Sequence, residues 1–242
     1  MIQDLHRRAA VSSSFTPSAR RLGVVSAAGT VVLSVVYAAT LVAGLVSLQS
    51  PQQPIGDPLF SVLEVLILLL VPLMVVLMGA VHAWASVEAR MFSRMALVFM
   101  SLMAGITCSV HFVILTVSRE AAFAGRAWTP LLSFEWPSVA YALDILAWDV
   151  FFALSVLFAA PVFRGGRLAA SVRVLLVASG VLALAGLGGV VAGDIRMRMV
   201  GVVGYAGVFP VAALLLALLF HRAVPRTPTG PEGGGVHREG EP

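Results

Sequence analysis

Ionisable side chains lie inside long apolar stretches of this sequence: Glu64, His111, Asp144 and Asp149. A charged side chain at membrane depth costs about 2.5–3.5 kcal/mol on insertion scales, so each one needs a partner or a water-filled cavity. Carboxylates and an imidazole can together exchange a proton, bind a cation or hydrogen-bond a small polar molecule. The residue types therefore indicate a site for a proton, a cation or a small polar ligand.

The spacing of these residues predicts that some of them meet. At a helical rise of 1.5 Å per residue, Glu64 lies about 7 Å, His111 about 10 Å and Asp144 about 9 Å from the outer membrane surface. Side chains of different helices can touch only where their depths match, so we expect one outward-facing polar pocket. Further side chains at similar depth or on the same helix faces complete the predicted pocket: Thr107, Tyr141 and Tyr205.

Other polar residues are expected to have other roles. Asp149 follows Asp144 by five residues, which turns it about 140° around an α-helix, so it is expected to make a different contact. Asp194, Arg196 and Arg198 fall in a short connection and are expected to be solvated. Two histidines at predicted helix ends, His82 and His221, are interpreted as interfacial anchors.

A metal site is an alternative interpretation of the same residues. Glu64, His111 and Asp144 could supply nitrogen and oxygen ligands and leave one position open for water. Only one histidine is available at that depth, and neither HxxxH nor HExxH occurs in the sequence, so neither a metal nor any other cofactor is expected. No catalytic residue can be nominated, because the sequence has no GxSxG elbow and its lack of lysine excludes a phosphate-binding GxxxxGK[ST] loop.

The elements that hold these residues are apolar helices. Apolar residues make up 59% of the 242 residues and charged residues 12%, against about 45–50% and about 25% in soluble domains. A helix needs about 20 apolar residues to cross a bilayer. The sequence therefore predicts an all-α integral membrane protein, a bundle of six transmembrane helices at about 23–48, 59–83, 95–118, 138–162, 170–192 and 199–221.

The arginines predict the orientation of this bundle. All sixteen basic residues are arginine, and alternate connections divide them into twelve on one side and four on the other. Cytoplasmic loops retain positive charge, so both termini are expected in the cytoplasm and the protein in the plasma (inner) membrane. Because the arginines are scattered among helix ends rather than gathered in one patch, nucleic acid is not an expected partner.

The predicted domain organisation is a cytoplasmic segment at 1–22, a transmembrane domain at 23–222 and a disordered cytoplasmic tail at 223–242. The lipid bilayer is the expected partner. Small residues at four-residue spacing, Ala185, Gly189 and Gly193, form a ridge that could join helices or copies of the chain, with Gly201 and Gly204 facing it across the turn.

Three functional classes remain open from the sequence. The first is a small transporter or a protein that responds to a proton or ligand in the outward-facing pocket. The second is a structural or partner-binding membrane subunit, and the third is a membrane-embedded metal-dependent enzyme. The polar residues gather at one depth and not along the small-residue ridge that would favour assembly, which favours the first class. An enzyme is the less expected class, because no catalytic residue can be nominated.

Overall fold

The computed structural model describes residues 15–50, 55–117, 129–134 and 136–224. Within these ranges six helices are long and apolar enough to cross a membrane, which confirms the predicted bundle and is compatible with a multi-pass membrane protein. Residues 225–242 of the predicted tail lie outside the described residues. The six spans are Pro17–Val46, Leu59–Trp84, Val87–Thr116, Val139–Val162, Arg167–Ala192 and Arg196–Arg222.

Several spans are composed of more than one helical segment. The first, second and fifth are the single helices α2 (Pro17–Val46), α3 (Leu59–Trp84) and α8 (Arg167–Ala192). The third is a short 3-10 turn, η1 (Val87–Ala89), followed by α4 (Arg90–Thr116), and a short helix, α5 (Thr129–Leu132), precedes the fourth. The fourth and sixth spans each contain a π-helical segment, η3 and η6 respectively. The fourth span consists of α6 (Val139–Ile145), η3 (Leu146–Phe152), α7 (Ala153–Ala159) and η4 (Ala160–Val162). The sixth consists of η5 (Ile195–Arg198), α9 (Met199–Val202), η6 (Val203–Val208) and α10 (Phe209–Arg222).

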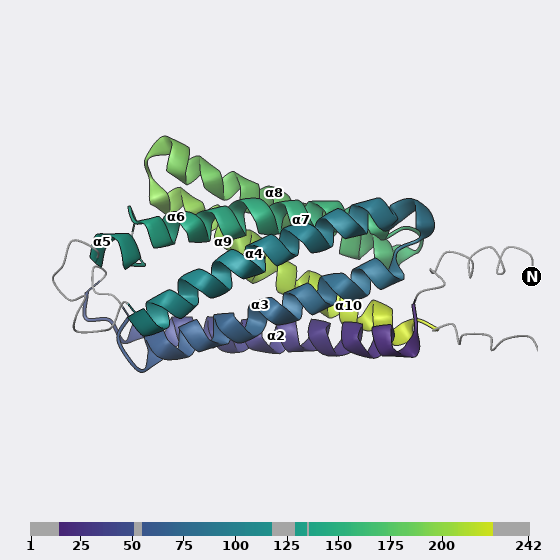
Figure 1. Cartoon of the computed structure of the whole chain (residues 1–242), viewed down its shortest axis with the longest axis horizontal. Coiled ribbons are helices and arrows are strands. Elements are labelled where there is room, and N and C mark those ends of the chain that lie inside the picture. Colours follow the sequence, from purple (N-terminus) through teal and green to yellow (C-terminus); the bar gives the residue numbers. More distant parts are fainter. Residues whose placement is uncertain (1–14, 51–54, 118–128, 135, 225–242) are drawn as a thin grey trace, which may run out of the picture.

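The helices pack so that α2 begins and α10 ends at the same end of the bundle (Figure 1). Helix α2 packs against α3 and α10, α4 lies between α3 and α7, and α8 packs against α7, α9 and α10. The guanidinium of Arg20 donates a hydrogen bond of 2.6 Å to the carbonyl of His221, which joins the first turn of α2 to the last turn of α10. We call this end of the bundle the terminal end and the opposite end the far end.

Local sequence explains where two of the helices begin and end. Helix α2 begins at Pro17, six residues before the predicted start, because the Thr16 hydroxyl accepts a hydrogen bond of 3.2 Å from the amide of Ala19 and proline suits the first helical position. Helix α8 ends at Ala192 because the next residue, Gly193, has a φ of 70°, a left-handed conformation that glycine adopts without a steric penalty.

Small residues allow α8 and the sixth span to approach closely. A Cβ atom on Gly186 would lie 3.0 Å from the Cα of Gly201, and one on Gly204 would lie 2.6 Å from the carbonyl oxygen of Ser179. Gly201 and Gly204 therefore face α8 as predicted. Gly189 also packs closely against a segment of the same chain, since a Cβ atom on it would lie 2.8 Å from the Asp194 carbonyl oxygen. Association between copies through Ala185, Gly189 and Gly193 stays a prediction.

Candidate functional site: a buried ionic chain

Five ionisable side chains from four spans form a continuous series of contacts in the far half of the bundle. We call this series the ionic chain. All of its members are buried, with exposed fractions between 0% and 5%, and in order of contact they are Glu64, His111, Asp144, Arg198 and Asp149. Because all five side chains are buried and contact one another, they form a closed cluster in this structure; its opening towards the outside stays a prediction.

His111 of α4 lies between two carboxylates. Its Nδ1 is 2.7 Å from Oε2 of Glu64 on α3, the distance of a strong charge-assisted hydrogen bond. On the other side of the ring, Nε2 faces Oδ1 of Asp144 on α6 at 3.6 Å, and this nitrogen has no hydrogen-bond partner among the described residues. The imidazole therefore connects α3 to α6 through one short contact and one longer contact.

Arg198 of η5 lies between two further carboxylate contacts. Its Nη2 donates to Oδ2 of Asp144 and its Nε donates to Oδ2 of Asp149, each at 2.9 Å. The guanidinium also lies over the ring of Tyr141, with Cζ 4.8 Å from the ring centroid. The guanidinium of Arg198 thus links the segment that follows α8 to both acids of the fourth span. The prediction that Arg198 is solvated is wrong, because its side chain is turned into the bundle.

The π-helical segment η3 explains how Asp149 reaches the same cation as Asp144. In a π-helix the backbone hydrogen bonds run between residues five apart, one residue more than in an α-helix, so the chain turns through a smaller angle at each residue. Residues Leu146–Phe152 adopt this geometry, so a residue five positions after Asp144 returns to the same face. The predicted 140° separation assumed a regular α-helix, and the structure corrects it: Asp149 joins the cluster through Arg198.

Two local features hold Arg198 at this depth. The Asp194 carboxylate accepts a hydrogen bond of 3.0 Å from the amide of Arg196, which starts the short helix η5, and both of these residues are exposed as predicted. One turn further on, Gly201 leaves room for the acid that Arg198 contacts: a Cβ atom there would lie 2.8 Å from Oδ1 of Asp149. A side chain at position 201 would therefore displace the carboxylate.

Aromatic rings cover the ionic chain on two sides. Phe134 lies 5.4 Å from the imidazole of His111, centroid to centroid, and 5.2 Å from the ring of Tyr141. On the other side the ring of Tyr205 packs 5.0 Å from Trp148, next to Asp149 in η3. These apolar surfaces lower the local dielectric and strengthen each ionic contact that they cover.

The remaining predicted side chains take different positions. Thr107 is buried, and its hydroxyl donates a hydrogen bond of 3.5 Å to the sulfur of Met103 in its own helix. His82, interpreted as an anchor, has its Nδ1 2.8 Å from the hydroxyl of Ser93 near the terminal end. His221 is exposed at the end of α10.

The geometry does not fit the metal alternative. Glu64 and Asp144 contact opposite nitrogens of the His111 ring, so the three side chains do not converge on one point as the ligands of a metal must. Across the described residues, no group of three or more histidine, cysteine, aspartate or glutamate side chains is arranged to hold a metal ion.

Comparison of the chain with protein-family models, with curated proteins and with solved structures finds no match. The chemistry of the ionic chain is therefore what indicates a function. Arg198 is the member that sequence reasoning missed. The available signal was electrostatic: two aspartates in one apolar span require a cation nearby, and few arginines lie near the far end.

Proposed function

We propose that this protein is a proton-responsive membrane protein, in which the ionic chain binds and releases a proton and thereby changes how the spans pack. The observation that carries the proposal is an imbalance of buried charge. The ionic chain contains three carboxylates, those of Glu64, Asp144 and Asp149. It contains only two groups that can carry a positive charge, the imidazole and the guanidinium.

The imbalance follows from a count of charges. With His111 protonated and Arg198 charged, two positive charges face three negative charges, and one negative charge remains without compensation. Contacts of these five groups within the described residues supply no further cation. An uncompensated charge in a low-dielectric interior is strongly unfavourable, and such a group becomes neutral instead. A proton on one carboxylate removes the imbalance.

Two atoms of the chain are placed to share or accept this proton. The Nε2 atom of His111 and Oδ1 of Asp144 face each other at 3.6 Å, which is attractive only when a proton lies between them. Oδ1 of Asp149 is buried and has no hydrogen-bond partner among the described residues. A protonated carboxyl donates as well as accepts, so uptake at either place would change which contacts the chain can make.

These contacts are also the polar links between spans. Glu64 and His111 link α3 to α4, while Arg198 links η5 to α6 and η3. Neutralising Asp149 weakens its contact with Arg198 and releases the π-helical segment from the sixth span. The packed Trp148 and Tyr205 rings belong to two facing π-helical segments, η3 and η6, and π-helices often occur at functional sites. We place the conformational response there.

The proposal includes a location and an orientation. The described part of the terminal end is rich in arginine, and cytoplasmic loops retain such charge, so we assign both termini to the cytoplasm of a cell bounded by its plasma membrane. In this orientation the ionic chain lies in the outer half of the bilayer. The proton would then exchange with the external side.

Infrared difference spectroscopy tests the proposal. Wild-type protein in lipid nanodiscs is expected to gain a protonated-carboxyl band when the pH is lowered from mildly alkaline to mildly acidic. The band is expected to disappear or shift in Asp149→Asn and Glu64→Gln. Glu88→Gln is the matched control, because Glu88 is exposed at the terminal end and its loss should leave the band unchanged. A band that is absent from the wild type, or is identical in all four proteins, would contradict the proposal.

A conformational response is the second half of the test. The fluorescence of Trp148 is expected to change over the same pH range as the infrared band, since its ring packs beside Asp149 and against Tyr205. Subtracting the signal of Trp148→Phe isolates this residue from the other tryptophans. A Trp148 signal that stays constant while the carboxyl titrates would contradict a coupled response and would favour a purely structural network.

The structural subunit is the competing function, and the full burial of the five groups is the observation that favours it. A structural network keeps one protonation state throughout the physiological pH range and shows no titrating band. Solute transport would require the helices around the closed cluster to separate, and the geometry gives transport no separate support.

A further inference from the structure

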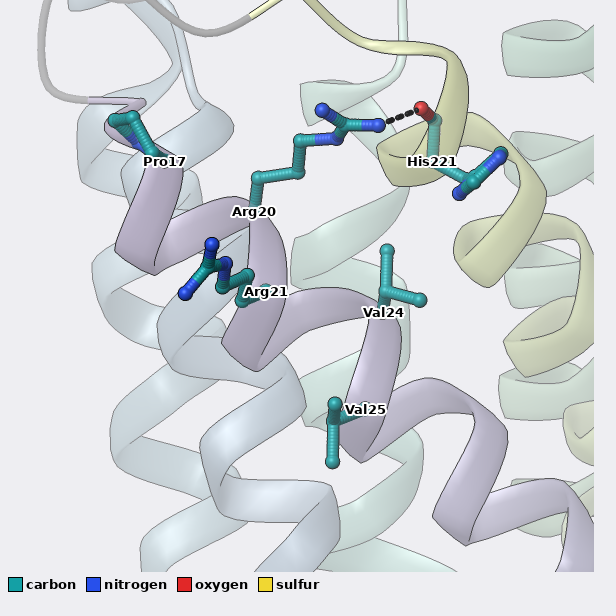
Figure 2. A pocket seen from close by; sticks show the side chains of 6 residues that line it. All are labelled: Pro17, Arg20, Arg21, Val24, Val25 and His221. Atoms are coloured by element: carbon teal, nitrogen blue, oxygen red, sulfur yellow. Dashed lines mark hydrogen bonds between the residues drawn. The ribbon is translucent and has the colours of Figure 1, made fainter.

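We propose that the terminal end binds an anionic phospholipid in a hollow between α2 and α10, independently of the ionic chain. The hollow has a volume of about 420 Å³, and we call it the arginine hollow. It is lined by Pro17, Arg20, Arg21, Val24, Val25 and His221 (Figure 2).

The polar part of the hollow offers hydrogen-bond donors to a phosphate. Arg20 extends across the hollow and uses Nη2 to donate to the carbonyl of His221, which fixes the direction of its guanidinium (Figure 2). Arg21 forms no hydrogen bond or ion pair with any residue that the structure describes. Guanidinium groups bind phosphate oxygens with several parallel hydrogen bonds, so the pair is suited to a phosphate headgroup.

The apolar part of the hollow lies one helical turn deeper. Val24 and Val25 follow the two arginines along α2 by four residues, which is about 6 Å along the helix axis. Val25 is 66% exposed and faces outward from the bundle. The arginines can therefore bind the phosphate of a phospholipid headgroup while the valines contact the start of its acyl chains. A soluble phosphate has no apolar part that the valines could contact.

The charge of the surrounding surface favours an anionic lipid over a zwitterionic one. Within the described part of the chain, the terminal end has one acidic residue, Glu88, and eight arginines: Arg20, Arg21, Arg90, Arg94, Arg164, Arg167, Arg173 and Arg222. Basic clefts between transmembrane helices bind anionic headgroups, and each basic residue near the surface strengthens that attraction about fivefold. The arginine hollow is the place where this charge meets an opening between helices.

Native mass spectrometry of protein released from nanodiscs tests the assignment. In nanodiscs of phosphatidylcholine with a minor fraction of phosphatidylglycerol, the wild type is expected to retain one phosphatidylglycerol in preference to phosphatidylcholine. Replacing both Arg20 and Arg21 with glutamine is expected to weaken this retention about thirtyfold, because two surface charges are lost. The matched control, Arg164→Gln with Arg167→Gln, removes the same charge around the start of α8 and should keep the lipid.

A second variant tests the contribution of the apolar space to lipid binding separately from that of the arginine charges. Val25→Trp fills the apolar part and keeps both arginines, and it is expected to lose the retained lipid while its fold, followed by circular dichroism, is unchanged. Inorganic phosphate at equal phosphorus concentration should not displace the lipid. Equal retention by all variants, equal loss in the Arg164 and Arg167 control, or displacement by inorganic phosphate would overturn the proposal.

Discussion

The two ends of this bundle are held together by different chemistry. At the terminal end the large buried side chains are apolar, and Leu77, Met78 and Phe220 are each 0% exposed. In the far half the spans are linked by the ionic chain, whose members must meet specific atoms at specific distances. Apolar contacts tolerate many shapes of similar volume, whereas a buried ion pair fails when one partner is removed. The comparison indicates that the terminal end provides packing and the far half carries the chemistry.

Removing Arg198 is expected to have the largest effect. Arg198→Met keeps the length of the side chain but leaves Asp144 and Asp149 without their cation, which should destabilise the protein by about 3–5 kcal/mol. Steric-trap unfolding in bicelles measures this change in free energy. Arg196→Met is the control: its side chain, two residues earlier in η5, is exposed, so the expected change is within about 0.5 kcal/mol. Equal effects of the two substitutions would contradict the role of Arg198 as the buried cation that holds Asp144 and Asp149.

A smaller effect is expected from crowding the Asp149 carboxylate. The Cβ of Gly201→Ala would lie 2.8 Å from Oδ1 of Asp149 and 3.3 Å from the carbonyl of Ala183, so either the acid or the backbone must move. The expected cost is about 1–3 kcal/mol, measured by the same unfolding assay, together with a shifted infrared band of the carboxyl group. Gly188→Ala serves for comparison, because nothing lies within 4 Å of its added Cβ atom, and a similar cost there would contradict the steric argument.

The smallest effect is expected at the terminal end. Met78→Leu conserves volume in a fully buried apolar site and should cost less than about 1.5 kcal/mol. It should also leave the pH dependence of the infrared band and of Trp148 fluorescence unchanged. A large loss of stability, or an altered pH response, would show that the two ends are not separable.

The fold was predictable because a span in lipid must satisfy its own backbone hydrogen bonds, and a run of about 20 apolar residues therefore identifies a helix. The six predicted spans and the six observed helices agree, although Pro17 begins the first helix earlier than the hydropathy suggests, since its capping signal lies in Thr16 and not in the apolar run. The orientation and the type of membrane stay predictions.

The candidate site was predictable only in part. Matching depth suggested the meeting of Glu64, His111 and Asp144, which depends only on helical rise, and the structure brings these three together. Asp149 was misplaced because a local π-helix changes the angular position of every later residue, and hydropathy contains no sign of that change. Arg198 was misplaced because an arginine near a turn is usually solvated, and burial of its guanidinium depends on the shape that Gly201 allows.

Solid-state NMR can follow the buried proton in protein labelled with ¹⁵N in histidine and ¹³C in the carboxyl groups of aspartate and glutamate. It reports the protonation state of His111 and of each acid in the ionic chain. At mildly acidic pH we expect His111 to be protonated at both nitrogens and one of the three carboxyls to be neutral, and raising the pH should remove a proton from the ionic chain. Three ionised carboxylates beside a neutral imidazole throughout this range would contradict it.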